Sequence, residues 1–460
     1  MRRDKGDLVM ISTRAPPKTG SLLGTFVCRS PFASSGRSRV IWLAAFAAVA
    51  PALAAAQTES PAPPPYSQQG EKLVGSLVVG PAEQGWSVAL SADGNTAIVG
   101  GLVDNKLNGA AWIYTRNRDV WTQQGHKLVG SGVAGQSGQG ISVALSADGQ
   151  TAVVGGPYDN RTTGAVWIYM RAEGDWTQVG SKLVGTGAIG RSAQGSAVAL
   201  SADGNTAIVG GPYDNGSVGA TWIYVRGRDA WTQQGNKLIG TGAVGSARQG
   251  VSVALSADGN TAIVGGVADN HLVGAAWVYT RRGGVWSQQG TKLVGTGALG
   301  NAAQGVSVAL SADGNTAIVG GVADNNDAGA AWIYARNNGV WTQQGAKLVA
   351  SDAIGKAAQG HSVALSADGN TAFVSGPHEN DGTGAAWIYA RSGTGWIQQG
   401  TKLVGTGATG SARQGSSVAL SADGNTAIMG GIADNRLTGA AWVHVRRGGA
   451  WSEPAAHLGY

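Results

Sequence analysis

The stretch QGVSVALSADGNTAIVGGVADN, residues 249–270, decides the fold because it occurs seven times with small changes. The serine of its SADG segment stands at Ser91, Ser146, Ser201, Ser256, Ser311, Ser366 and Ser421, so each step is 55 residues. A fixed period of this kind indicates repeated supersecondary units, each of which buries its apolar faces against its neighbours.

Each repeat is predicted to contain four β-strands, named a to d. In the first repeat these are SVALS (87–91), TAIVGG (96–101), GAAWIYTR (109–116) and a strand within WTQQGHKLVG (121–130). β-Branched and aromatic residues are frequent in these segments. The Asp-Gly pair between strands a and b predicts a tight type I′ turn, which needs positive φ at both central residues. No segment shows a helical period.

Four antiparallel strands in one repeat form a propeller blade, and propellers typically have about 4–8 blades. We therefore predict that residues 66–460 form an all-β, seven-bladed β-propeller of four-stranded antiparallel blades. An open β-solenoid is the alternative, but it would leave two long edges and would usually have a shorter period. The 76 glycines fall at fixed offsets, which argues against a disordered low-complexity chain.

Residues 1–56 precede the repeats and resemble a leader with a signal peptide. Arg37 and Arg39 come before an apolar run from Val40 to Ala56, which ends in the small residues of an A-x-A cleavage site. An uncleaved membrane anchor is the alternative interpretation. Residues 57–65 (QTESPAPPP) are predicted to be a stiff proline-rich linker. The mature chain is therefore expected at the cell surface, in the periplasm or outside the cell, without a membrane span.

The positive charge of the chain lies in the leader. Subtracting the leader's eight basic and two acidic residues from the chain's 33 and 27 leaves 25 of each, so the mature chain is neutral. Neutrality gives no electrostatic reason to expect nucleic acid as a partner. The single cysteine also lies in the leader, so the mature chain has no disulfide.

Two tryptophans recur in each repeat, at Trp112 and Trp121 in the first. Such a series could bind sugars, but identical residues in every repeat favour packing between blades.

The segment YSQQGEKLVG (66–75) is an intact strand d, whereas the C-terminal copy WSEPAAHLGY (451–460) is degraded and contains Pro454. We expect residues 66–74 to pair with strand c of the last repeat, residues 439–446, and so close the ring.

The repeated module, with its Gln-Gly, SADGN, Asp-Asn and GAAWIYTR segments in fixed order, resembles the bacterial FG-GAP repeat and the propeller of integrin α chains. The resemblance covers residues 66–460 and implies an exported propeller used in adhesion or ligand binding. Gln84-Gly85 and its equivalents replace the family's Phe-Gly. The calcium loop of integrin blades is replaced by SADGN with one carboxylate, such as Asp93, whereas calcium takes about 6–8 oxygen ligands. No metal and no cofactor are expected.

Three further positions recur in the repeats. An Asp-Asn pair follows strand b, starting at Asp104, with Glu379 once in place of Asp. It is interpreted as an Asx cap of its own backbone, and a carboxylate site is the alternative. An arginine such as Arg116 ends each strand c, and it could pair with Asp93, stack on tryptophan, or form an anion-binding ring. Gln84 and its equivalents could satisfy loop backbone groups or present a polar ring at the channel mouth.

The b–c loops vary between repeats, whereas unchanged turns leave little room for specificity, so the face formed by b–c and d–a loops is the predicted binding surface. Drift at unconstrained loop tips is the alternative. The candidate ligand-binding residues are Tyr158, Tyr213, His378, Lys106, Arg161 and Arg436.

No HExxH, GxSxG or P-loop occurs, and the same residues repeat in every blade. The sequence therefore favours a non-enzymatic, monomeric binding or adhesion scaffold for an extracellular or periplasmic protein or glycan. A polysaccharide hydrolase or lyase, or a purely structural envelope protein, are the alternatives.

Overall fold

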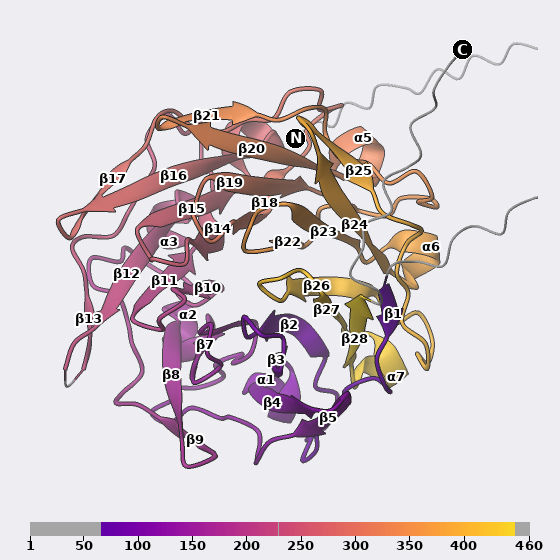
Figure 1. The fold of residues 1–460 in the computed structure, drawn as a ribbon. Coiled ribbons are helices and arrows are strands. Elements are labelled where there is room, and N and C mark those ends of the chain that lie inside the picture. The colour runs from indigo at the N-terminus through magenta and orange to yellow at the C-terminus, as the bar shows by residue number, and fades with distance from the viewer. Residues whose placement is uncertain (1–65, 229, 447–460) are drawn as a thin grey trace, which may run out of the picture. The chain divides into compact units, whose positions relative to one another are not determined.

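The computed structural model describes residues 66–228 and 230–446. Seven four-stranded antiparallel sheets are arranged around a central axis (Figure 1), so the predicted all-β, seven-bladed propeller is confirmed. Blades 1 to 6 consist of β2–β5, β6–β9, β10–β13, β14–β17, β18–β21 and β22–β25, and blade 7 of β26, β27, β28 and β1. The leader, the linker and residues 447–460 lie outside the described residues.

The strands occupy the same positions in every blade. The innermost strands a are β2 (Gln84–Leu90), β6 (Ser142–Leu145), β10 (Ala197–Leu200), β14 (Gln249–Leu255), β18 (Gln304–Leu310), β22 (Val363–Leu365) and β26 (Gln414–Leu420). Strands b are β3 (Thr96–Gly101), β7 (Thr151–Gly156), β11 (Thr206–Gly211), β15 (Thr261–Gly266), β19 (Thr316–Gly321), β23 (Thr371–Gly376) and β27 (Thr426–Gly431).

Strands c and d complete the sheets towards the circumference. Strands c are β4 (Ala110–Asn117), β8 (Ala165–Ala172), β12 (Ala220–Arg226), β16 (Ala275–Arg282), β20 (Ala330–Asn337), β24 (Ala385–Ser392) and β28 (Ala440–Arg446). Strands d are β5 (Val120–Gln123), β9 (Asp175–Gln178), β13 (Trp231–Gln233), β17 (Val285–Gln288), β21 (Val340–Gln343), β25 (Gly395–Gln398) and, for blade 7, β1 (Tyr66–Gln68).

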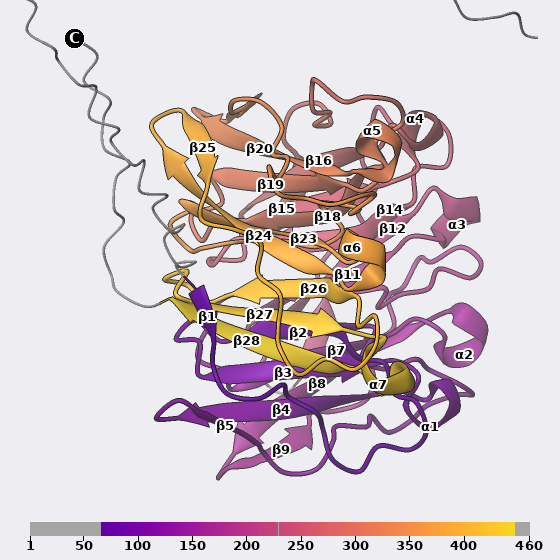
Figure 2. The same cartoon turned by 90° about the vertical axis from the view of Figure 1, so that its right-hand side faces the viewer.

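The two ends of the blades form different surfaces. One carries the b–c and d–a loops and is called the loop face; the other carries the a–b and c–d turns and is called the turn face. Each b–c loop contains one short helical turn, and Figure 2 shows these turns along one side of the propeller. They are α1 (Asp104–Leu107), α2 (Asp159–Thr162), α3 (Asp214–Ser217), α4 (Asp269–Leu272), α5 (Asp324–Asp327), α6 (Glu379–Gly382) and α7 (Asp434–Leu437).

The N-terminal strand closes the ring, as the sequence predicted. β1 pairs antiparallel with β28, with Tyr66 opposite Arg446, and Leu73 forms a further bridge to Ala441. The tyrosine that replaces tryptophan in this strand is buried, and its hydroxyl donates to the carbonyl oxygen of Gly424. Both ends of the described chain therefore belong to one blade.

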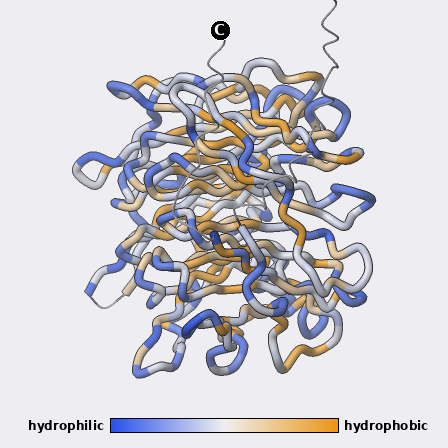
Figure 3. Tube along the Cα trace, turned by 45° about the vertical axis from the view of Figure 1, so that its right-hand side comes forward, coloured by the Kyte–Doolittle hydropathy of each residue, from blue (hydrophilic) through white to orange (hydrophobic). Residues whose placement is uncertain are grey.

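The strand c tryptophans fill the space between blades. Trp112 of blade 1 is fully buried against Ile428 and Val443 of blade 7, and its indole N–H donates to Ser76 O at 2.8 Å. A Cβ at Gly75 would lie 2.2 Å from the indole ring, so this position needs glycine. Hydrophobic residues follow the strands and hydrophilic residues the projecting loops (Figure 3). The predicted packing role of these tryptophans is confirmed.

A closed circle of backbone hydrogen bonds joins the a–b turns around the axis. Ala92 N–H donates to Ala147 O at 2.9 Å, and the same bond continues through Ala202, Ala257, Ala312, Ala367 and Ala422 back to Ala92.

The predicted type I′ turn is wrong: of the loop residues 92–95, only Gly94 has positive φ (66°). Gly94 N–H donates to Ser91 O at 3.0 Å, and Asp93 accepts from the Ser91 hydroxyl, so a four-residue loop stabilised by the aspartate replaces the tight turn.

Candidate functional site

The loop face is held rigid by buried ion pairs. In blade 4, Asp269 Oδ2 lies 2.5 Å from Lys292 Nζ, and Oδ1 accepts a hydrogen bond from Val244 N–H at 2.7 Å. The equivalent pairs are Lys72–Asp434, Lys127–Asp104, Lys182–Asp159, Lys237–Asp214, Lys347–Asp324 and Lys402–Glu379. The structural role of this carboxylate is confirmed, but an Asx cap of its own backbone is wrong: the carboxylate joins the b–c loop to the d–a loops before and after its blade. Glu379 makes the same contacts.

The residues after this carboxylate adopt a left-handed conformation. Asn105 and Lys106 have φ of 50° and 59°, and the same pair in blade 2, Asn160 and Arg161, has 47° and 56°. Non-glycine residues enter this region at a cost, so surrounding contacts must hold the loop there. The backbone N–H of Asn105, for example, donates to Val79 O. Lys106, Arg161 and Arg436 are thereby exposed on the loop face.

The other repeated polar residues are structural. Arg281 stacks on Trp286 with the guanidinium 5.4 Å from the ring centroid, and Arg116, Arg336 and Arg391 stack in the same way, so the stacking interpretation is confirmed for these blades. Gln249 is buried; its side chain accepts from Gly240 N–H at 2.5 Å and donates to Gly240 O at 3.0 Å. The glutamines therefore satisfy loop backbone groups. In residues 66–446 without 229, no three His, Cys, Asp or Glu side chains could hold a metal ion.

The predicted ligand-binding residues lie on the loop face, but the structure distributes them over several blades. Tyr158 and Arg161 line one groove of about 440 Å³ with Gln136 and Leu107. Tyr213, 46% exposed, lies under the guanidinium of Arg248 at 5.7 Å from the ring centroid. Lys106 and Arg436 are exposed on the loops of blades 1 and 7. They line neither this groove nor the larger one described next.

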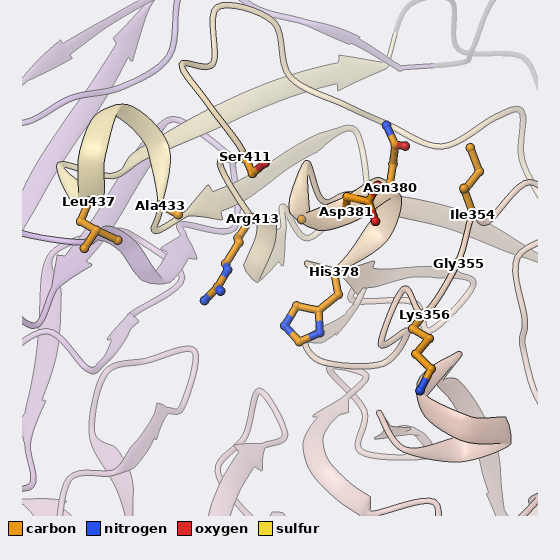
Figure 4. Close-up of a pocket in the computed structure, with 11 residues that line it drawn as sticks. Ile354, Gly355, Lys356, His378, Asn380, Asp381, Ser411, Arg413, Ala433 and Leu437 are labelled. Carbon is orange, nitrogen blue, oxygen red and sulfur yellow. The ribbon is translucent and has the colours of Figure 1, made fainter.

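The larger groove, of about 690 Å³, lies between the loops of blades 6 and 7. His378 of the b–c loop lies between Arg413 and Lys356, which come from the d–a loops of blades 7 and 6 (Figure 4). Asn380, Asp381 and Ser411 add polar groups, and Ile354, Ala433 and Leu437 add apolar ones. His378 is thus part of a site, whereas Tyr158 belongs to another groove.

Sequence reasoning placed the d–a loops on the predicted face but named no candidate residue in them. The residue before the repeated glutamine varies between blades: Glu83, Gly138, Ala193, Arg248, Ala303, Ala358 and Arg413. Each of these residues has positive φ, between 53° and 62°. Because the b–c loops alone were compared, the arginines that complete two of the grooves were overlooked. The c–d turns on the opposite face vary as well, but within residues 117–120, 172–175, 227–228, 282–285, 337–340 and 392–395 they contain no aromatic residue or histidine.

Titratable groups near the axis of the loop face influence one another across blades. Burial raises the pKa of Glu83, and the nearby Arg413 opposes this shift. Burial also raises the pKa of Tyr158, with smaller contributions from Tyr213 and Glu83. Burial and then the neighbouring His378 lower the pKa of His361, which precedes β22, to about 4. Burial is therefore the main cause of these shifts, and charged groups of neighbouring loops make smaller contributions.

Neither the scan against protein-family models nor the search of curated proteins found a match to this chain. Of the described helical turns, none is long and apolar enough to cross a membrane.

Proposed function

We propose that this protein is an exported, non-enzymatic binding module of the FG-GAP type, whose ligand binds on the loop face. One observation carries the proposal: exposed rings that differ between near-identical blades, Tyr158, Tyr213 and His378, stand on loops that buried ion pairs hold rigid. Variable side chains on a rigid scaffold are the usual arrangement of a recognition surface. In the described part of the chain, the carboxylates, glutamines and arginines that recur from blade to blade make structural contacts, so the proposal gives them no catalytic role.

The test is combined replacement of Tyr158, Tyr213 and His378 by alanine, followed by screening the mature protein on an array of glycans and matrix proteins. We expect the variant to lose binding while its melting temperature stays close to that of the wild type, because all three side chains are exposed. The control replaces Val120, Val285 and Val340, exposed by 62%, 70% and 63% near the c–d turns, and should bind normally. Unchanged binding by the first variant would exclude the loop face.

Export rests on the leader sequence. The arginine-flanked apolar run with its A-x-A ending predicts cleavage after Ala56. N-terminal sequencing of the protein recovered outside the cytoplasm should therefore read Gln57 first. An N-terminus upstream of Val40 would show that the leader is retained.

A further inference from the structure

The residues that line the groove between blades 6 and 7 have sequence counterparts three repeats earlier. Positions 165 residues before its lining residues form the loops between blades 3 and 4. There, Arg191 corresponds to Lys356, Tyr213 to His378, and Arg248 to Arg413. The smaller lining residues match too, with Ile189 for Ile354, Ser246 for Ser411 and Leu272 for Leu437. The loops between blades 3 and 4, called groove 3/4, therefore carry the same set of side chains as the groove between blades 6 and 7: one ring and two basic residues.

The other five inter-blade positions lack this plan. Where blades 3 and 6 place Tyr213 and His378, blades 1, 4, 5 and 7 have Val103, Ala268, Ala323 and Ala433. Blade 2 has Tyr158 there, but its basic partners are replaced by Gln136 and Ala193. The repeats are otherwise nearly identical. A ring and two basic residues occur together at only two of the seven positions, so packing of the blades does not require them.

The geometry leaves these side chains accessible. Arg248 and Arg413 are exposed, and Arg248 is held over Tyr213 by a stacking contact rather than by a carboxylate. Lys356 lies 3.2 Å from Asp327, but both side chains are more than half exposed, so this pair is weak and easily displaced. Asp381 lines the groove between blades 6 and 7, whereas Gly216 stands at its place between blades 3 and 4.

Charge is also distributed unevenly between the two faces. Apart from the buried ion pairs, the b–c and d–a loops carry seven basic residues, Lys106, Arg161, Arg191, Arg248, Lys356, Arg413 and Arg436, and five acidic ones, Glu71, Glu83, Asp327, Asp352 and Asp381. On the turn face, the described a–b and c–d segments carry ten of each sign. The neutral mature chain thus presents a positive loop face, which net charge alone conceals.

We propose that these two grooves bind a carboxylate-bearing glycan chain, with one acidic sugar in each groove; this inference rests on the proposed loop-face binding function. Arginine binds carboxylates through two parallel hydrogen bonds. The ring of Tyr213 or His378 offers a flat surface to the apolar side of a sugar, and Ser246 or Ser411 supplies hydroxyl contacts. A polymer with a repeating anionic unit suits two like grooves on one face, and occupying both raises its avidity.

A nucleic acid is the less suitable polyanion. Its phosphates are closely spaced and require a continuous basic surface, whereas five carboxylates interrupt the loop face. Groove 3/4, which lacks the counterpart of Asp381, is the stronger of the two sites, because no carboxylate there repels the ligand.

The experiment titrates the mature protein with a short oligogalacturonate by calorimetry. We expect about two sites per chain, and Arg248→Ala or Arg413→Ala should each abolish one, since a lost charge-assisted contact weakens binding about tenfold or more. Alanine already stands at this position in blades 3, 5 and 6, so folding should be unaffected. The matched controls Arg118→Ala and Arg282→Ala remove exposed cations from the turn face and should keep both sites.

Polymer binding provides the second measurement. Polygalacturonate should bind more tightly than the short oligomer, and the double variant Arg248→Ala/Arg413→Ala should lose this advantage. Equal binding of neutral dextran, equal binding of DNA, or a single site unaffected by both arginine variants would overturn the inference. A different outcome would separate this inference from the proposed function. If the protein bound only a neutral glycan or a protein, and the alanine variant of Tyr158, Tyr213 and His378 lost that binding, the inference would be wrong while the proposed function would stand.

Discussion

At the scale of single residues, one position on strand c separates blade 7 from the others. Six blades place a buried tyrosine there, Tyr114, Tyr169, Tyr224, Tyr279, Tyr334 and Tyr389, and blade 7 has His444, which is 3% exposed. Burial lowers the pKa of His444 to about 4. An unfolded histidine titrates near about 6.5. Between these pH values the unfolded chain binds the extra proton, so stability falls as the pH drops through this window.

Replacing His444 by tyrosine, the residue of the other blades, should remove this acid sensitivity. Relative to the wild type, we expect the variant to gain about 2 to 3 kcal/mol of unfolding free energy on going from pH 7 to pH 4.5. Urea unfolding followed by tryptophan fluorescence at both pH values measures the difference. Replacing the exposed His271 is the control and should give no such gain. Equal pH dependence in His444→Tyr and wild type would contradict the assignment.

At the scale of elements, the N-terminal strand contributes more than three paired residues. Gln69 accepts hydrogen bonds from Arg116 and from the Trp121 indole, and Lys72 pairs with the buried Asp434. Deleting residues 57–75 removes all of these contacts and leaves Asp434 unpaired, which is costly for a buried charge. We expect the melting temperature to fall by about 10 °C or more.

Differential scanning calorimetry of the mature chain and the deletion variant tests this expectation. Deleting residues 447–460 serves as the comparison, because β1 already occupies the strand d position of blade 7. If the C-terminal deletion were the damaging one, the N-terminal strand would not be what stabilises the closed ring.

The same scale shows what sequence patterns can predict here. The period, the four strands of each blade and the closing strand were predictable because alternation and strand d similarity are local features. The Asp-Gly turn and the Asp-Asn pair were misinterpreted because Asp93 and Asp269 are satisfied differently: Asp93 by a serine two residues away, and Asp269 by groups more than 20 residues away. Of the candidate site, the rings of the b–c loops were predicted, but Arg248 and Arg413 were not. These arginines lie in neighbouring d–a loops, which only the fold brings beside the rings.

At the scale of the whole propeller, seven nearly equivalent blades allow the point of closure to be moved. In blade 7, Arg446 lies opposite Tyr66, just as Arg281 lies opposite Trp286 in blade 4. In blade 4, four residues connect Arg281 to Trp286. A four-residue linker from Arg446 to Tyr66 should therefore form an ordinary c–d turn. Opening the chain between Gly283 and Gly284 then makes β17 the N-terminal strand that closes blade 4, just as β1 closes blade 7.

We expect this circular permutant, residues 284–446, the linker and then 66–283, to fold as a monomer with a melting temperature within roughly 5 °C of the mature chain. Size-exclusion chromatography, circular dichroism and calorimetry measure the three properties. The circle of alanine hydrogen bonds around the axis contains no c–d turn residue, so moving the termini leaves it complete. The new c–d turn has the length found in blade 4. A permutant that nevertheless aggregates would mean that closure at blade 7 depends on residues 447–460 or on the order in which the blades fold, rather than on the register shared by all blades.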